Sequence, residues 1–284
     1  MKFSAFSLSV LLMILSVSNA HARLLVAVTV PAQAWLVKQI AGKHVDLLTM
    51  VPPGHVPESA QPGPRNLARF QKADIHFTIG HPNFIFETRY IKPYREKSDA
   101  ATWISMYEIV EKVMPTHMLE ASDPHLWTSP SIMMASARVV EQSLARLDPE
   151  NADVFQKNLR QLNEKIKSYD EQLRMQLEGR DSDKLLVYHP AWGHFCQDFG
   201  LQQIAIEKEG KAPGAGSLSG LFTRLENHNI TNIISSPGAD QRIASLIADQ
   251  FKINLMLVNP MDSDWYKMML TMKQALEIDN NHDR

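Results

Sequence analysis

Cysteine is almost absent from this sequence: Cys196 is the only one among 284 residues. A single thiol excludes an intrachain disulfide framework and any zinc or iron–sulfur site built from several cysteines. An excess of charge of one sign is missing as well, because 29 lysine and arginine residues face 31 aspartate and glutamate residues, for a formal net charge of −2. Nucleic-acid-binding proteins usually carry a basic excess, so this balance argues against nucleic acid as a partner.

Apolar runs long enough to cross a membrane are missing too. The longest, over residues 3–17, follows a positively charged start and is too short for a comfortable span. Ala20 and Ala22 then form the small-x-small pattern that signal peptidase recognises. We therefore expect residues 1–22 to be a cleavable signal peptide and the mature protein to be soluble in the periplasm, without stable membrane insertion. No cysteine stands at the cleavage point, so a lipoprotein is not expected.

The remaining composition is that of an ordinary globular protein, with 44% hydrophobic, 8% aromatic and 21% charged residues. The chain is long enough for one large or two medium domains. It shows no internal repeat and no low-complexity tract. Histidine stands out with eleven residues, which makes imidazole the first candidate for functional chemistry.

Short β-branched runs alternate with helical patterns in the first part of the chain. The expected elements are strands at residues 24–30, 45–51 and 75–79 and helices at residues 33–42 and 65–71. This alternation is typical of an α/β lobe with a parallel sheet.

A long helix is predicted next, over residues 148–178. Its apolar residues recur at steps of 4, 3, 4, 3 and 4 and form one stripe, consisting of Phe155, Leu159, Leu162, Ile166, Tyr169 and Leu173. At 1.5 Å per residue such a helix spans roughly 40 Å. Fewer than four clean heptads make a coiled coil the weaker alternative, so we expect the helix to lie against the body of the protein and connect two lobes.

Strands and helices alternate again after Gly179. The expected elements are strands at residues 185–188, 203–206, 232–235 and 255–258 and helices at residues 191–199, 217–228, 240–251 and 265–277. The predicted fold class is therefore α/β, with two parallel-sheet lobes over residues 23–147 and 179–284 joined by one long helix.

Three segments place imidazoles or carboxylates beyond strand ends, where ligands bind in open α/β sheets. The first is the Pro-rich loop after the second strand, with His55 and Glu58. The second lies between Pro-bounded segments and contains Asp123 and His125. In the third, His189 ends a strand and begins a turn into a helix. A lone loop histidine is usually solvated or part of the core, but three at equivalent places indicate a binding site.

The chemistry of these side chains favours metal binding over catalysis. Neutral imidazole suits Zn, Cu, Fe and Ni, whereas carboxylates favour harder ions such as Mn. Cys196 lies in a predicted helix without the signature of a nucleophile and is expected to be a buried core thiol. The compact HExxH motif of metal hydrolases is absent, so an enzyme is not expected. His81 and His194 lie near candidate strand ends and are expected at most to support the ligands.

These segments together resemble the zinc- and manganese-type periplasmic receptors of ABC importers, the solute-binding protein family 9. The resemblance runs from about residue 24 to residue 276 and rests on VPPG (51–54), QPGPRNLARFQKAD (61–74), DPHLW (123–127), LDPENADVFQKNLRQL (147–162), VYHPAWGHFCQDFGL (187–201), IEKEGKAPGAGSL (206–218) and DWYKMM (264–269). It implies two α/β lobes joined by a long, fairly rigid helix, with the metal held in the cleft between the lobes.

The resemblance assigns His125 and His189 to two of the family's metal-binding histidines. Members typically read VPPG-x-x-PH, but Glu58 follows Pro57 in this chain, so the expected histidine is missing. His55 lies three residues earlier in the same loop and is the alternative ligand.

The fourth ligand of the family is often an acidic residue near the end of the last strand. Asp262 is the chosen candidate, ahead of Asp264 and Asp240. Two imidazoles with two carboxylates make a harder site than three imidazoles, whereas His55 in place of Glu58 restores a zinc-like set. Zn²⁺ is therefore the expected ligand and Mn²⁺ or Fe²⁺ the alternative. A drifted site that binds metal weakly, or binds another ligand, also stays open.

The function that the resemblance implies is capture of a divalent metal ion and delivery to an ABC-type membrane permease by a monomeric receptor. Tyr188, Trp192 and Trp127 are expected to wall the site and orient the histidines. One alternative is an exported metalloenzyme with Glu58 as its general base, and another is an adhesin-like surface protein on the same fold. The first lacks a compact catalytic motif and the second a lipid-attachment cysteine.

Overall fold

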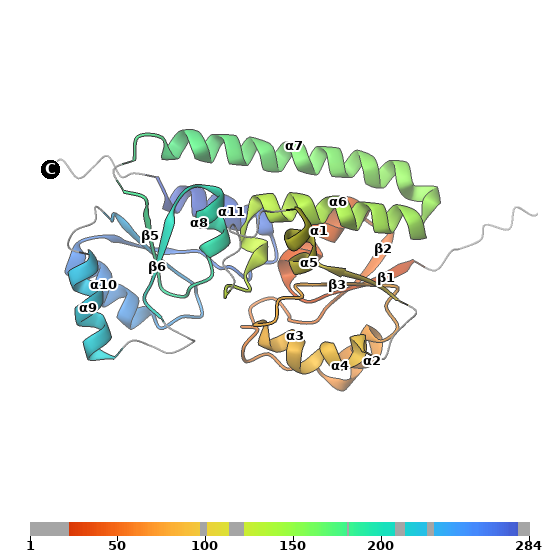
Figure 1. Ribbon diagram of the computed structural model, residues 1–284, viewed down its shortest axis with the longest axis horizontal. Helices are drawn as coiled ribbons and strands as arrows, with labels where there is room; N and C mark the ends of the chain where they lie inside the picture. The colour runs from red at the N-terminus through yellow and green to blue at the C-terminus, as the bar shows by residue number, and fades with distance from the viewer. Residues whose placement is uncertain are drawn as a thin grey trace, which may run out of the picture.

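The structure is a computed structural model that describes residues 23–96, 101–113, 122–180, 182–207, 214–225 and 230–277. It consists of two α/β lobes placed side by side, with one long helix running along both (Figure 1). Both sheets have four strands, and every strand pairing in them is parallel. The predicted fold class is therefore confirmed. The predicted signal peptide lies outside the described residues.

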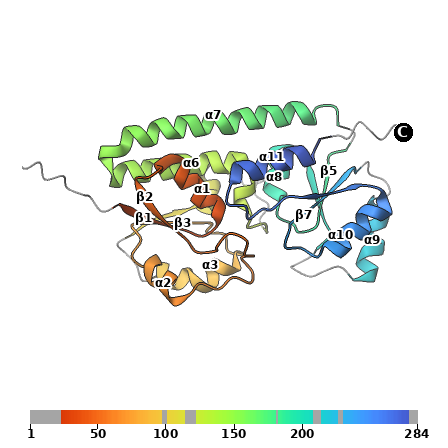
Figure 2. The ribbon, with the colours of Figure 1, turned by 180° about the vertical axis from the view of Figure 1, so that it is seen from behind.

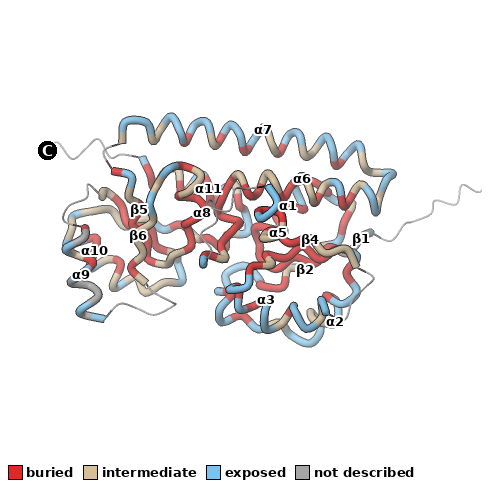
Figure 3. Tube along the Cα trace, in the orientation of Figure 1, coloured by how far each residue is buried: buried red, intermediate tan, exposed pale blue. Residues whose placement is uncertain are grey.

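The first lobe has the strand order β2-β1-β3-β4. Its strands are β1 (Leu24–Val28), β2 (Val45–Thr49), β3 (Ile75–Thr78) and β4 (Thr102–Ser105), and its helices are α1 (Pro31–Ala41), α2 (Pro64–Phe70), α3 (Ile85–Tyr90), α4 (Lys92–Arg95), α5 (Met106–Val113) and α6 (Pro130–Leu147). All of β3 and the last three residues of β1 are buried, and Figure 3 shows buried residues gathered in the interior of both lobes. Burial on both faces explains why β1 reads as a continuous apolar run, LLVAV, in the sequence. Strand β3, with the sequence IHFT, buries His76 and Thr78 as well as its two apolar residues.

The second lobe repeats this arrangement with the strand order β6-β5-β7-β8. Its strands are β5 (Lys184–Val187), β6 (Gln202–Ala205), β7 (Asn232–Ser235) and β8 (Asn254–Leu257), and its helices are α8 (Gly193–Asp198), α9 (Ala215–Leu225), α10 (Gln241–Phe251) and α11 (Trp265–Ala275). In each lobe the first strand pairs in parallel with the strand that follows the next helix, which is a βαβ unit: β1 pairs with β2, and β5 pairs with β6.

Helix α7 (Ala152–Leu177) connects the two lobes. At 1.5 Å per residue its 26 residues span about 40 Å. Five of the six residues of the predicted apolar stripe are buried, and the sixth, Leu159, packs against the core. The helix lies on α1 and α6 of the first lobe, and Gln176 donates a 2.9 Å hydrogen bond to the Lys273 carbonyl of α11 in the second (Figure 2). It therefore braces both lobes along one side.

Beneath α7 the two lobes share one hydrophobic core. Trp35 of α1 and Trp265 of α11 meet with ring centroids 5.1 Å apart. A second, smaller core is confined to the face of the second sheet that α9 and α10 cover. The packed junction leaves the carboxyl ends of the strands as the place where the lobes can enclose a ligand. Within the described part of the chain, no helix combines the length and the apolarity that a membrane span requires.

Candidate metal site

A cavity of about 470 Å³ lies between the carboxyl ends of the two sheets. The second lobe contributes the residue or loop that follows each of its four strands, and the first lobe contributes the loop after β2. The lining residues are Gly54, His55, Val56, Pro57, Glu58, His125, His189, Glu207, Ser236, Pro237, Gly238, Ala239, Asn259, Pro260 and Met261. This is the position that the fold reserves for a ligand.

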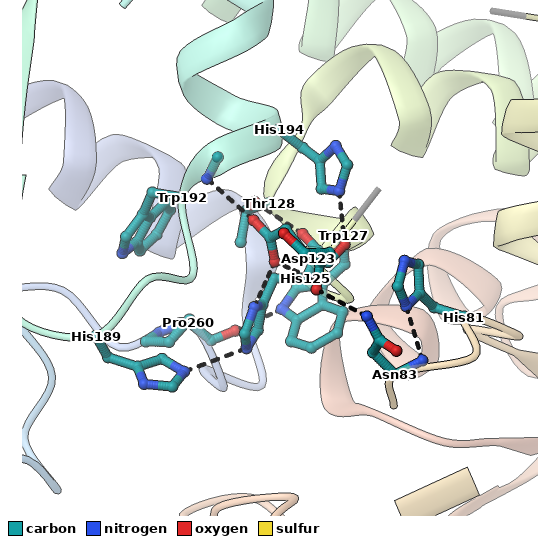
Figure 4. Close-up of polar contacts among 12 residues, drawn as sticks. His81, Asn83, Asp123, His125, Trp127, Thr128, His189, Trp192, His194 and Pro260 are labelled. Atoms are coloured by element: carbon teal, nitrogen blue, oxygen red, sulfur yellow. Dashed lines mark hydrogen bonds and ion pairs between the residues drawn. The ribbon is translucent and has the colours of Figure 1, made fainter. Parts of the chain in front are cut away.

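Three side chains converge in this cavity: Glu58, His125 and His189. One potential ligand atom from each lies within 4.8 Å of those of the other two. The Nε2 atoms of the two histidines are 3.4 Å apart, and the rings stand at 88° to each other (Figure 4). Among the described residues, this is the one group of three or more histidine, cysteine or acidic side chains with such a geometry. The segments that carry them are separated by 64 residues or more in the sequence.

His125 is buried and held by Asp123. The side chain of Asp123 is itself buried, and its Oδ1 accepts hydrogen bonds from the backbone N–H of His125 at 2.8 Å and from its Nδ1–H at 2.6 Å. Burial opposes ionisation of Asp123, but the charge and hydrogen bond of His125 outweigh it and hold the pKa of that carboxyl below its usual value. An ionised carboxylate can only accept, so Nδ1 carries the proton and Nε2 is left to face the cavity.

His189 is held in a similar way by Glu207, which follows β6. The His189 Nδ1 lies 3.2 Å from Glu207 Oε2, and the two side chains are 26% and 14% exposed. Burial lowers the pKa of the imidazole, but the hydrogen bond and charge of Glu207 outweigh it and raise the pKa of His189 above its ordinary value. Sequence reasoning missed Glu207, although its position just beyond a strand end is the signal that identified His189.

The segment with His125 is attached to the second lobe by further hydrogen bonds. Trp127 donates from Nε1 to the Pro260 carbonyl at 2.8 Å, and Trp265 donates from Nε1 to the Trp127 carbonyl at 2.7 Å. Asp198 of α8 accepts from the hydroxyls of Ser129 and Ser131, both at 2.6 Å. His125 precedes α7 in the sequence, yet these contacts fix it to the lobe that carries His189.

Glu58 reaches the cavity from a loop whose backbone hydrogen bonds are made within the loop. Val51-Pro52-Pro53 stiffen its start, and Gly54 supplies the positive φ of 81° that the turn requires. The loop's hydrogen bonds are local, such as that from the Ala60 N–H to the Val56 carbonyl at 3.0 Å. Glu58 is exposed. The third member of the cluster is thus the most accessible one.

The other predicted ligands lie outside the cluster. His55 is exposed and lines the cavity, with its Nδ1 3.4 Å from the Pro53 carbonyl oxygen. Asp262 does not line the cavity, because the turn after β8 directs its carboxylate back to the N–H of Asp264 at 2.9 Å. Asn259 to Met261 face the cavity in its place. Asp264 and Asp240 cap the N-termini of α11 and α10.

None of the three aromatic residues predicted to wall the site, Trp127, Tyr188 and Trp192, lines the cavity. Trp127 packs against the His125 ring with centroids 5.2 Å apart. Tyr188 and Trp192 are buried in the cores and do not line the cavity. Of the other candidates, His194 donates from Nε2 to the Asp123 carbonyl at 2.9 Å, and His81 accepts from the Asn83 N–H at 3.1 Å. Cys196 is buried in the core, as expected.

Two imidazole nitrogens and one carboxylate oxygen are a ligand set for a divalent transition metal. Two nitrogens bound at about 2.0–2.1 Å in tetrahedral geometry are separated by about 3.3–3.4 Å. The separation of the two Nε2 atoms, 3.4 Å, fits that value.

Comparison with known proteins shows the family of the chain and agrees with its fold. Residues 26–277 match the family described as the zinc-uptake complex component A, periplasmic. The high-affinity zinc uptake system protein ZnuA of Bacillus subtilis is 24% identical over 245 residues, which cover 79% of this chain and 74% of that protein.

Solved structures of the same fold include a crystal structure of ZnuA, with a TM-score of 0.77 and 25% identity, covering 89% of this chain and 97% of the other. The solute-binding protein FpvC of Pseudomonas aeruginosa, solved in complex with Mn²⁺, has a TM-score of 0.72 and 19% identity, with coverage of 90% and 96%. At that identity the likeness to FpvC is one of fold.

Proposed function

This chain belongs to the family of periplasmic components A of zinc-uptake complexes, which are solute-binding proteins and not enzymes, and on that premise we propose that it captures a divalent transition-metal ion and delivers it to an ABC-type import permease. It acts in the periplasm as a monomer, after export by a cleavable signal peptide and without a lipid anchor. The observation that supports this most is the convergence of Glu58, His125 and His189 in one cavity.

Zn²⁺ is the cargo that we favour. The relative from Bacillus subtilis is named for zinc uptake, and the spacing of the two Nε2 atoms suits a tetrahedral ion. Glu58 in place of the family's histidine makes the ligand set harder, and a harder ligand set favours Mn²⁺ and Fe²⁺ more than three imidazoles would. The fold alone does not choose between them, since FpvC has the same fold in complex with Mn²⁺.

The protein's part in transport is binding without covalent chemistry. Two preformed imidazole donors take the ion, and the Glu58 carboxylate completes the contact from the first lobe. Enclosure between the lobes removes water and strengthens the attraction between ion and ligands. A water molecule fills the remaining position, and His55, which lines the same cavity, is not needed as a ligand. The loaded form then docks on the permease through both lobes, and loop shifts distinguish it from the empty form.

Elemental analysis of protein purified from its native compartment tests the proposal. Wild-type protein is expected to carry close to one equivalent of Zn, and His125→Ala to carry almost none. Glu58→Ala is expected to reduce the metal content and His55→Ala to leave it nearly unchanged. A wild-type protein without Zn, Mn or Fe would contradict metal capture, and an unchanged metal content in Glu58→Ala would contradict the assignment of Glu58.

A further inference from the structure

Both histidines of the cavity meet a carboxylate through the nitrogen that faces away from the other ring. Asp123 binds Nδ1 of His125 at 2.6 Å, and Glu207 binds Nδ1 of His189 at 3.2 Å (Figure 4 shows the first pair). Neither Asp123 nor Asp198 lines the cavity, whereas Glu207 does. Asp123 therefore touches a ligand without being able to touch the cargo from the cavity side.

We propose that Asp123 and Glu207 are positioning residues, which bind the Nδ1–H of His125 and His189 and so direct both Nε2 lone pairs at the same ion. The proposal rests on the proposed function, because it assigns a role at the same site. The nitrogen of an imidazole that binds metal is determined by the hydrogen bond that the other nitrogen makes. A carboxylate at Nδ1 removes the tautomer in which a proton occupies Nε2.

Of the two positioning residues, Asp123 should hold its histidine more firmly than Glu207 does, because hydrogen bonds from several directions fix the orientation of Asp123 itself. Its Oδ1 accepts two bonds from His125, and its Oδ2 accepts the N–H of Gly193 at 3.2 Å. Its carbonyl accepts from His194 at 2.9 Å. Gly193 and His194 begin α8 in the second lobe. Asp123 thus sets the ring of His125 relative to the lobe that holds His189, and this sets the spacing of the two Nε2 atoms.

Glu207 makes a longer contact with a single partner atom of His189 and is more exposed. Without the Glu207 carboxylate, the His189 ring is freer to rotate and to change tautomer, but a water molecule can replace the lost acceptor. The expected effect of removing Glu207 is therefore smaller than that of removing Asp123.

The test compares Asp123→Asn and Glu207→Gln with Asp198→Asn as a matched control. Asp198 also joins the 123–131 segment to α8 through carboxylate hydrogen bonds, but its partners are Ser129 and Ser131 and not a histidine. Zn²⁺ affinity is measured by competition with a chromogenic chelator. We expect a loss of about 10- to 100-fold for Asp123→Asn, a smaller loss for Glu207→Gln, and wild-type affinity for Asp198→Asn. Equal losses in Asp123→Asn and Asp198→Asn would show a merely structural role and overturn the proposal.

A second measurement reads the tautomer directly. Long-range ¹H–¹⁵N spectra of the zinc-free wild type at mildly alkaline pH are expected to show His125 protonated at Nδ1. In Asp123→Asn the amide offers a donor as well as an acceptor, and the proton is expected to move largely to Nε2. A wild-type His125 protonated at Nε2 would overturn the proposal even if Zn²⁺ binds well. Failure of the wild type to bind any metal would instead contradict the proposed function and leave this spectral test in force.

Discussion

The two sides of the candidate site are built in opposite ways. On one side His125 and His189 are buried or half-buried, and each is bonded to a carboxylate within the protein. On the other side Glu58 is exposed on a loop whose hydrogen bonds are local. The histidine side is therefore prepared before an ion arrives, whereas the loop side can still adjust to it.

This difference indicates a division of tasks. In the proposed metal site we expect the rigid pair of histidine nitrogens to supply most of the affinity, because little order has to be imposed on binding. The accessible carboxylate influences which ion is preferred and how easily it leaves. It is also on the loop side that Glu58 stands where the resemblance to the family predicts a histidine. Changes to the two sides should thus have effects of different size and kind.

The largest effect is expected from removing an imidazole. His125→Ala or His189→Ala leaves two donors in the cavity, and we expect Zn²⁺ affinity to fall by more than the roughly 100-fold upper value for losing an outer partner. Competition with a chelator measures it. His44→Ala is the control, since His44 lines a different cavity. Wild-type Zn²⁺ affinity in either His125→Ala or His189→Ala would contradict the assignment of that histidine as a ligand.

Acidification should have the next largest effect, and it acts on the histidine side. Metal binds the neutral imidazole, and the raised pKa of His189 lets protons compete at a higher pH than at an ordinary histidine. Affinity should drop up to about tenfold for each pH unit below that pKa. Glu207→Gln removes the group that raises the pKa of His189 most, so the loss of Zn²⁺ affinity in this variant should begin at a lower pH than in the wild type. Isothermal titration giving equal wild-type affinity at about pH 5.5 and about pH 7.5 would refute histidine ligation.

Changes to the loop side should be milder. Glu58→Ala is expected to weaken Zn²⁺ binding by about tenfold, equivalent to about 1.4 kcal/mol, because water can enter the exposed position. Glu58→His restores the family's imidazole and should favour Zn²⁺ over Mn²⁺ relative to the wild type. Competition between the two ions on each variant measures the preference. The account of Glu58 fails if His55→Ala weakens binding while Glu58→Ala does not.

The smallest effect on metal is expected from Asp198→Asn, which weakens a junction between the lobes. Asp198 accepts from two serine hydroxyls and one backbone N–H, so urea unfolding should show a loss of about 1–2 kcal/mol in the free energy of unfolding. The bonds of Trp127 and Trp265 still hold the segment, so Zn²⁺ affinity should stay within about twofold, or about 0.4 kcal/mol. A large loss of affinity would mean that the histidine side is less rigid than its contacts indicate.

The sequence predicts those helices and strands whose apolar residues follow one regular spacing. Strand β1, which is largely buried, reads as an apolar run, and α7 shows its stripe. The sequence pattern predicts no helix or strand between residues 81 and 147. This region contains α3 and α4, which are too short for a period to develop, and β4, which lies at an edge of the sheet. Helix α6 also buries Ser136 and Ser143, which a pattern reads as polar.

The sequence predicts those parts of the site that depend only on local features, such as the position of a residue at the end of a strand. Strand ends indicated His189 and Glu58, since carboxyl ends meet at one edge of a parallel sheet. The placement of Asp262 depends on how the turn after β8 rotates, which no local pattern determines. The closeness of His125 to His189 depends on packing of the 123–131 segment onto the other lobe through the hydrogen bonds of Trp127 and Trp265. Such contacts join residues more than 60 positions apart and leave no periodic signal.

Anomalous diffraction from crystals of the zinc-loaded protein, recorded at the zinc absorption edge, tests the central claim most directly. The account predicts one strong peak in the cavity, about 2.0–2.1 Å from Nε2 of both His125 and His189, with a Glu58 oxygen closing in from the first lobe. A peak at another set of residues, or none at these two nitrogens, would contradict it.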